Sequence, residues 1–350
     1  MKKKKPRVLF VASLADESNH FDGERNKSSL ILKYLTSIAN VTAINYTKNK
    51  YLQSLKMIIL LTFRRYDKII ISKAITGASV AFDILKFMHV KKQTIYYFMM
   101  GFGFVGFDDK RINPKGKKFK MQNFHYCNKI ICEAQIVKDQ LAKDGFTNVA
   151  IFPCLKEQYP VQTEKQFEIQ KTLKLIFFSR AVDSKGIFDL IKSIKIVNSD
   201  FPKYDLVIAG ASIKNDEKLL LGLIEGRKDI HYLGTSFSVT GQETYQELAK
   251  YDLHVFPTKN RQEGIPGSII DFFIAGVPTL SSSYPAVREI LDDDCAYFFE
   301  YENVDSLTKS LIHIYENQEE LFSKRKYALK RAERYTPSRF VEFVSKEIFA

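Results

Sequence analysis

The chain has 350 residues, 45% of them hydrophobic, which excludes a mainly disordered protein and suits two domains of ordinary size. Its net charge of +13 comes from residues 1–160, which carry 28 Lys and Arg against 12 Asp and Glu, whereas the remaining residues carry 25 against 28. A basic first half attracts anionic membrane surfaces, phosphate-bearing substrates or nucleic acid, and no recognisable binding motif supports nucleic acid. The alternative is an ordinary solvated surface that is rich in lysine.

The first half alternates short apolar runs, expected as buried strands, with longer amphipathic runs, expected as helices. We expect strands at Val8–Ala12, Val41–Tyr46, Lys68–Ser72, Thr94–Met99, Lys129–Cys132 and Val149–Phe152. We expect helices at about Asn26–Ala39, Leu52–Arg65, Ala78–His89, Lys118–Tyr126 and Gln135–Asp144. This regular alternation predicts a doubly wound α/β domain over residues 1–152.

Residues 153–172 contain Pro and polar residues without periodicity, as a linker does. A second alternating series follows, with strands expected at Leu173–Ser179, Asp205–Ala209, Ile230–Leu233, Leu253–Pro257 and Pro278–Ser281. It predicts a second Rossmann-like domain over residues 173–336, with a cleft between the two domains. The amphipathic segment 337–350 is expected to be a helix that folds back towards the first domain.

Two acids, Glu263 and Asp271, lie eight positions apart in the stretch Glu-Gly-Ile-Pro-Gly-Ser-Ile-Ile-Asp-Phe-Phe-Ile-Ala-Gly-Val-Pro, residues 263–278. A Gly-Ile-Pro-Gly-Ser turn opens the expected helix, so its first backbone N–H groups are available to an anion. The pattern therefore indicates a phosphate held at the helix tip, with carboxylates beside it for sugar hydroxyls. That is the chemistry of a nucleotide-sugar site.

This stretch resembles the Glu-x7-Glu signature of family-4 retaining glycosyltransferases of the GT-B fold, with Asp271 where the second Glu usually stands. The resemblance continues through the expected strand and into Arg288-Glu289-Ile290. Segments 128–133 and 141–149 look like the end of the first domain in the bacterial polysaccharide-assembly branch of this family. The resemblance implies two Rossmann-like domains and transfer of a sugar from a nucleotide donor.

A second element looks like the Arg-x4-Lys-Gly motif of the same family. Arg180 follows an expected strand, and Lys185-Gly186 precedes an expected helix at Ile187–Val197. Because ligands of open α/β sheets lie beyond the carboxyl ends of the strands, both cations should face the site. The resemblance implies that Arg180 and Lys185 neutralise the leaving nucleoside diphosphate in place of a metal. It also implies that Glu263 binds hydroxyls of the transferred sugar, which completes the catalytic set.

The donor-binding candidates come largely from the same resemblance, which implies that Asp271 binds the ribose hydroxyls. An acid in the first turns of a helix also interacts favourably with the helix dipole, so a structural role for Asp271 stays open. Gly23 stands where the family usually carries paired glycines, and it could equally be a turn residue. The full set is Gly23, Gly234, Thr235, Gly264, Ile265, Pro266, Gly267, Ser268 and Asp271.

Residues 101–106 form a literal G-x-G-x-x-G after a strand, a pattern that by itself would suggest a dinucleotide dehydrogenase. Neither the apolar helix nor the acid about 20 residues further on follows. We therefore interpret the glycines as a loop on the acceptor side of the cleft, next to a run of lysines. The acceptor-side and membrane-side candidates are Gly101, Gly103, Lys115, Lys117 and Lys118.

The segment Leu52–Arg65 combines an apolar stretch with Lys56, Arg64 and Arg65. This pairing favours contact with an anionic membrane surface. The alternative is an ordinary helix that packs against the sheet.

No metal site is expected. Asp292-Asp293-Asp294 contains a D-x-D but lacks the strand context of metal-dependent glycosyltransferases, and we interpret it as a solvated acidic loop. Cys127, Cys132, Cys154 and Cys295 lack the spacing of a zinc site or a disulfide framework. His125 lies between two aromatic residues of an expected helix and is predicted to be a core residue. We expect no cofactor, and a UDP-sugar is the favoured substrate.

The resemblance therefore implies a retaining, metal-independent hexosyltransferase that transfers a sugar to a hydroxyl of a lipid-linked surface glycan, such as a capsule. We expect it in the cytoplasm, peripheral on the inner face of the plasma membrane. The apolar run at Val8–Ala15 is at the short limit for a signal peptide, and no run approaches the ~20 apolar residues of a membrane span. Two alternatives remain, a non-catalytic GT-B chaperone or partner protein and a nucleotide-sugar epimerase.

Overall fold

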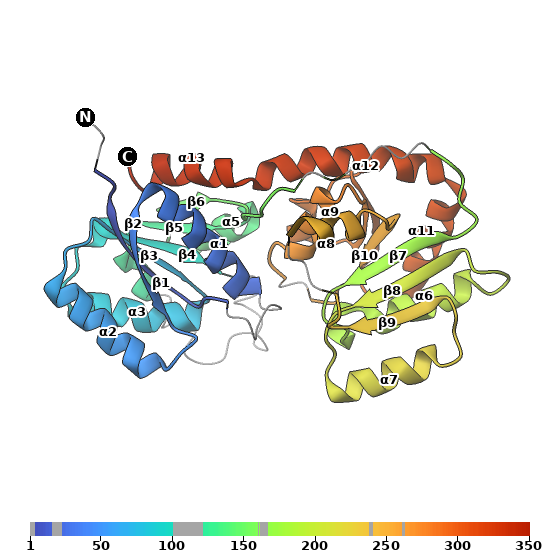
Figure 1. Cartoon of the computed structure of the whole chain (residues 1–350), viewed down its shortest axis with the longest axis horizontal. Coiled ribbons are helices and arrows are strands. Elements are labelled where there is room, and N and C mark those ends of the chain that lie inside the picture. The colour runs from blue at the N-terminus through green and yellow to red at the C-terminus, as the bar shows by residue number, and fades with distance from the viewer. Residues whose placement is uncertain are drawn as a thin grey trace. The chain divides into compact units, whose positions relative to one another are not determined.

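The computed structural model describes residues 4–15, 23–100, 122–159, 161, 167–237, 241–260 and 263–350, leaving aside the side chain of Thr76. The chain divides into two compact units. The first comprises Met1–Glu157, Gln262–Ile265 and Tyr335–Ala350, and the second comprises Gln158–Arg261 and Pro266–Arg334. In the described residues each unit is a parallel sheet flanked by helices (Figure 1).

The sheet of the first unit has the order β2-β1-β3-β4-β5-β6 in the described part of the chain, and all its pairings are parallel. Its strands are β1 Arg7–Ala12, β2 Asn40–Asn45, β3 Lys68–Lys73, β4 Ile95–Met99, β5 Lys129–Cys132 and β6 Val149–Ile151. In β1, residues 8–12 are completely buried, as expected for a parallel strand covered on both faces. The strand order reverses direction between β1 and β3, because β2 lies on one side of β1 and β3 on the other.

Helices cover both faces of this sheet (Figure 1). They are α1 Gly23–Ile38, α2 Lys50–Phe63, α3 Ile75–Phe87, α5 Gln135–Lys143 and α13 Pro337–Glu347, with 3-10 helices at Lys92–Thr94 and Gln122–Tyr126. On one face, Phe340 and Val344 of α13 pack with Phe10 of β1 and Leu35 of α1. On the other face, Phe82 of α3 forms an edge-to-face contact with Tyr97 at 5.6 Å. The last helix of the chain therefore belongs to the core of the first unit.

The sheet of the second unit has the order β12-β11-β10-β7-β8-β9 and is parallel throughout its described length. Its strands are β7 Leu173–Phe178, β8 Tyr204–Ala209, β9 Ile230–Gly234, β10 Leu253–Phe256, β11 Thr279–Ser282 and β12 Ala296–Phe299. Its helices are α6 Ile187–Val197, α7 Lys214–Ile224, α8 Gly241–Leu248, α9 Gly267–Ile274, α10 Pro285–Arg288, α11 Val304–Glu316 and α12 Gln318–Ala332. Short 3-10 helices occupy Asp183–Lys185 and Glu333–Tyr335.

The prediction of two doubly wound α/β domains is confirmed, and every expected strand lies within one residue of an observed one at each end. Strand β12 was missed. The prediction for His125 was wrong, because its side chain is exposed and stacks on Phe146 with ring centres 4.3 Å apart. The described residues around it form a 3-10 helix, whose tighter turn directs Phe124 inward and its neighbour outward.

None of the described helices is both long and apolar enough to cross a bilayer.

Candidate active site

The turn that carries Arg180 and Lys185 follows the carboxyl end of β7. Ser179 donates a backbone hydrogen bond to Ala209 of β8 at 3.2 Å, and the chain then leaves the sheet. The side chain of Arg180 is exposed, whereas Lys185, in the 3-10 helix Asp183–Lys185, is only 8% exposed. Both expected cations therefore lie in one short segment at the edge of the second sheet where ligands of this fold class bind.

Gly186 fixes the position of this turn. It adopts a left-handed conformation with φ of 74°, directly before α6. A Cβ atom at this position would lie 1.8 Å from the carbonyl oxygen of Pro257, which follows β10. Only glycine allows so close an approach, so the lysine turn and the loop after β10 are packed backbone to backbone.

Lys259 ties the same two segments together. Its backbone N–H donates to Ser184 at 3.0 Å, and its Nζ contacts Asp183 at 2.9 Å and Asp189 at 3.1 Å. The two acids neutralise this lysine, which was not among the expected site residues. Its role here is to hold the turn that carries Lys185.

Helix α9 begins at the position expected from the sequence. Its N-cap, Pro266, makes no side-chain capping hydrogen bond, and Ile269 donates to the Pro266 carbonyl at 3.2 Å. The N–H groups of Gly267 and Ser268 therefore lie in the first turn, at the positive end of the helix dipole. From Ile269 to Ile274 every residue is buried, so the helix tip is anchored by its apolar body.

Asp271 lies inside the second unit with only 3% of its surface exposed. Tyr245 of α8 donates a buried hydrogen bond to its Oδ1 at 2.8 Å, and the ring of Tyr245 stacks on Tyr159 at 5.2 Å. Nothing in the sequence pointed to Tyr245, because the pairing depends on how α8 packs against α9. One carboxylate oxygen of Asp271 thus has a structural partner, and its contact with ribose stays a prediction.

Glu263 belongs to the first unit, together with Gly264 and Ile265. The Nζ of Lys27 donates to the Ile265 carbonyl at 3.2 Å and pairs with Glu133 at 2.7 Å. Burial alone would lower the pKa of Lys27, but Glu133, with a contribution from Glu263, raises it above its usual range. The two acids of the signature are therefore divided between the units, and the convergence of Glu263 with Asp271 stays a prediction.

Two of the glycines expected to bind the donor differ in whether the local structure requires a glycine. Gly234 ends β9 with φ of 57° and accepts a hydrogen bond from Gly210 at 2.7 Å, and Thr235 beside it is exposed. Gly23 is the first residue of α1, and a Cβ atom there would meet no described atom within 4 Å. The structure therefore explains a glycine at 234 and gives no steric reason for one at 23.

His254 lies in β10, directly beneath α9. Its ring is completely buried and stacks on Phe272 with centres 4.0 Å apart. Nδ1 lies 3.1 Å from Thr279 Oγ1, while Nε2 has no hydrogen-bond partner among the described residues. Burial lowers the pKa of this imidazole to about 3. His254 is therefore neutral at physiological pH and adds no positive charge to the site.

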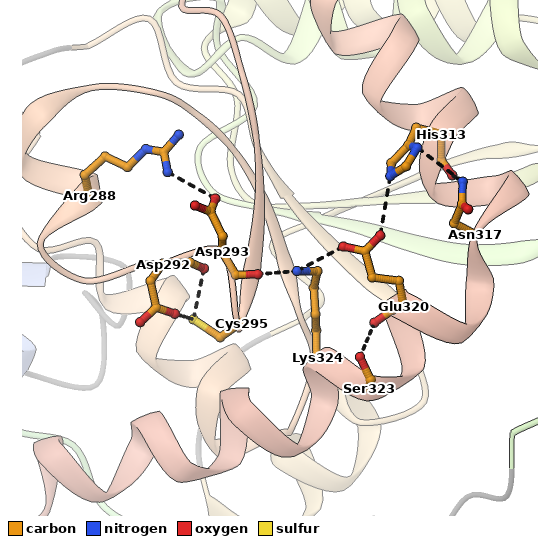
Figure 2. Close-up of polar contacts among 9 residues, drawn as sticks. All are labelled: Arg288, Asp292, Asp293, Cys295, His313, Asn317, Glu320, Ser323 and Lys324. Carbon is orange, nitrogen blue, oxygen red and sulfur yellow. Dashed lines mark hydrogen bonds and ion pairs between the residues drawn. The ribbon is translucent and has the colours of Figure 1, made fainter.

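The acidic turn at 292–294 is held by ion pairs (Figure 2). Asp293 contacts Arg288 at 3.2 Å, and its carbonyl accepts from Lys324, which also contacts Glu320 at 3.1 Å. Asp292 pairs with Arg331 of α12. These acids link the turn to α10 and α12. Within the described residues, no group of three His, Cys, Asp or Glu side chains is arranged to hold a metal ion.

The expected acceptor-side residues Gly101, Gly103, Lys115, Lys117 and Lys118 lie outside the described residues.

Comparison with protein-family models finds a match for the second half of the chain. The model for glycosyl transferases group 1 matches residues 160–334, which is half of the chain. The chain belongs to the group 1 glycosyl transferases. This glycosyltransferase has no match among curated proteins.

Solved structures that resemble this glycosyltransferase share its fold over nearly the whole chain. The HepE protein of Anabaena, in complex with UDP and glucose, has a TM-score of 0.77 at 12% identity, covering 98% of this chain and 99% of its own. Sucrose-phosphate synthase from Thermosynechococcus elongatus has a TM-score of 0.77 at 11% identity, with 98% of both chains covered. The lipopolysaccharide outer core galactosyltransferase WaaB has a TM-score of 0.69 at 12% identity, covering 98% of this chain and 99% of its own. The fold is therefore GT-B.

Proposed function

We propose that this protein is a retaining, metal-independent hexosyltransferase that transfers a sugar from a nucleotide sugar to a hydroxyl of a lipid-linked surface glycan. The observation that carries the proposal is the lysine turn of the second unit. Lys185 is held at the carboxyl edge of the sheet by the Gly186–Pro257 contact and by Lys259. The uncapped tip of α9 supplies backbone donors in the same unit.

In the proposed mechanism, a hydroxyl oxygen of the acceptor bonds to the anomeric carbon while the bond from that carbon to the diphosphate breaks. The diphosphate leaves with the electron pair and takes the proton of the hydroxyl. Arg180 and Lys185 stabilise the negative charge that develops on it, and the N–H groups of Gly267 and Ser268 add to this. Glu263 holds hydroxyls of the transferred sugar, and Asp271 serves the ribose.

For the donor we propose a UDP-sugar. HepE has been solved with UDP and with UDP-glucose, and its fold matches this chain over almost its whole length. The cations at 180 and 185 suit the diphosphate that every such donor carries.

On the acceptor side, we propose that the first unit rests on an anionic membrane surface. Residues of α2 at helical spacing present an apolar stripe that is 48% to 81% exposed, namely Tyr51, Leu52, Leu55, Ile59 and Phe63. Met57 is the buried residue of this helix. Next to Phe63, an open hollow of about 690 Å³ is lined by Arg7, Arg64 and Arg65 among others. Apolar side chains beside arginines match the acyl chains and phosphates of an anionic leaflet.

The test of the transferase is kinetic. Arg180→Ala and Lys185→Ala should each lower turnover of a UDP-sugar by at least about 100-fold, because each removes charge stabilisation of the transition state. Lys192→Ala is the matched control, since Lys192 is an exposed lysine of the neighbouring helix α6 with no proposed role. Turnover is measured as release of UDP in the presence of an acceptor, over a panel of sugars.

Near-normal turnover by both the Arg180 and Lys185 variants would contradict the assignment. UDP bound by the wild type, as measured by calorimetry, without transfer to any acceptor would favour the non-catalytic alternative. Donor consumed without acceptor and converted to an isomer would identify an epimerase.

A further inference from the structure

The first unit contains a buried lysine that the proposed mechanism does not use. Lys73 is the last residue of β3, and its side chain is only 6% exposed. Its Nζ donates to Ser13 Oγ at 2.7 Å and lies 4.9 Å from the centre of the Tyr46 ring. Across the described part of the chain, no carboxylate lies within ion-pair distance of this ammonium. A hydroxyl and a ring face are its only partners there.

A buried ammonium without a carboxylate is costly, because burial removes its hydration and a neutral hydroxyl restores little of it. Burial lowers the pKa of Lys73, while the more distant charges of Glu24 and Arg25 act in opposite directions. A charge kept in such surroundings is typical of a residue that binds a ligand of opposite charge.

Lys73 lies where the fold places ligands. In the first sheet the strand order reverses between β1 and β3, and the hydrogen bond from Lys73 to Ser13 spans the carboxyl ends of these two strands. In doubly wound sheets ligands bind at this switch point. Helix α3 starts two residues after Lys73, and its N-cap, Ala74, makes no side-chain capping bond. The first N–H groups of this 13-residue helix therefore lie at the same edge and favour an anion.

Gly77 keeps room for the lysine. A Cβ atom at this position would lie 2.5 Å from Lys73 Cε and 3.3 Å from its Nζ. The first turn of α3 thus leaves space for the lysine side chain, so the position of the ammonium is built by two segments of the chain.

We propose that Lys73 binds an oxyanion, a carboxylate or a phosphate, carried by the acceptor. This inference rests on the proposed function, which assigns the diphosphate of the donor to Arg180 and Lys185 of the second unit. The anion for Lys73 then belongs to the other substrate. The acceptor is accordingly an acidic glycan, and its charge comes either from a uronic acid or from a phosphate ester.

The first experiment measures binding to the full chain with UDP present at saturation, so that the donor site is occupied. Inorganic phosphate and methyl glucuronide are the two probes, and their relative affinities separate the two sources of charge. Lys73→Gln should weaken the better probe at least about tenfold, the loss expected for one hydrogen bond to a charged group. Lys68→Gln, at the opposite end of β3, is the matched control and should bind like the wild type.

Equal affinity of the wild type and the Lys73→Gln variant for both probes would overturn the proposal. A loss of UDP affinity in this variant would also overturn it, because the anion would then belong to the donor. If Lys73→Gln does not fold, Gly77→Ala replaces it. Alanine suits a helix but displaces the ammonium, so weaker binding of the same probe is expected, and unchanged binding would contradict the proposal.

The second experiment compares acceptors in neutral and acidic pairs, methyl glucoside with methyl glucuronide and glycerol with glycerol phosphate. The wild type should prefer the acidic member, and Lys73→Gln should lose this preference mainly through KM. Transfer without preference would refute the inference alone. No transfer to any acceptor, with anion binding at Lys73 intact, would refute the proposed transferase and leave the anion site standing.

Discussion

Gly186→Ala tests whether the packing of the lysine turn controls catalysis. The new Cβ would lie 1.8 Å from the Pro257 carbonyl oxygen, and ordinary contacts begin at 3.4 Å, so the turn must move by about 1.6 Å. A displacement of about 1 Å of a positioned group can cost about 100-fold in rate. We therefore expect turnover to fall at least about 100-fold. The left-handed backbone adds a loss of about 1–2 kcal/mol in the free energy of unfolding.

The matched control is Gly226→Ala. Gly226 has nearly the same conformation, with φ of 73°, but an added Cβ would meet no described atom within 4 Å. The backbone strain should lower the free energy of unfolding of Gly226→Ala by a similar amount, while its turnover stays at the wild-type level. Both variants are compared by urea unfolding and by UDP release at saturating donor. If Gly186→Ala transfers sugar as fast as Gly226→Ala, the position of Lys185 does not govern the rate and the reasoning fails.

Two further predictions concern stability and membrane binding. Below pH 6.5 the unfolded chain protonates His254, whereas the folded chain resists protonation down to about pH 3, so the free energy of unfolding should fall by up to ~1.4 kcal/mol per pH unit in this window. His254→Phe should remove this contribution to the pH dependence of the free energy of unfolding. Urea unfolding at several pH values measures that dependence, and the same dependence in the variant and the wild type would contradict the prediction. Phe63→Asp should reduce co-sedimentation with anionic vesicles, whereas Ile213→Asp, at an exposed apolar residue of the second unit, should not. Equal sedimentation of the wild type with neutral and anionic vesicles would exclude the membrane proposal.

The strands could be predicted because central strands of parallel sheets are buried on both faces and appear as continuous apolar runs. Ile69–Ile71 in β3 and residues 175–177 in β7 are of this kind. Strand β12, Ala296–Phe299, was missed; it follows the acidic turn at 292–294 and lies at the edge of the sheet. Its place in the sheet comes from pairing with β11, a contact that local sequence does not encode.

Only those parts of the site that depend on residues close together in the sequence could be predicted. The glycine-proline turn before α9 and the lysine-glycine pair before α6 are contiguous signals, and both helices begin where expected. The contact of Gly186 with Pro257 and the bond from Tyr245 to Asp271 join segments far apart in sequence. Such contacts arise from the packing of the elements, so the sequence pattern does not predict them.

The two sheets use the same physical arrangement with different lysines. Lys73 follows β3 and Lys185 follows β7, and the two are 6% and 8% exposed. Each lies next to a glycine whose missing side chain makes room, Gly77 for the ammonium and Gly186 for the backbone. A parallel sheet brings strand ends and helix starts to one edge, where partial positive charges already gather. A buried lysine strengthens that field, because its charge is poorly screened, so each unit is suited to an anion of its own. In a transferase whose nucleotide-sugar donor carries a diphosphate, the proposed anion site at Lys73 gives the enzyme a means of selecting an acidic acceptor.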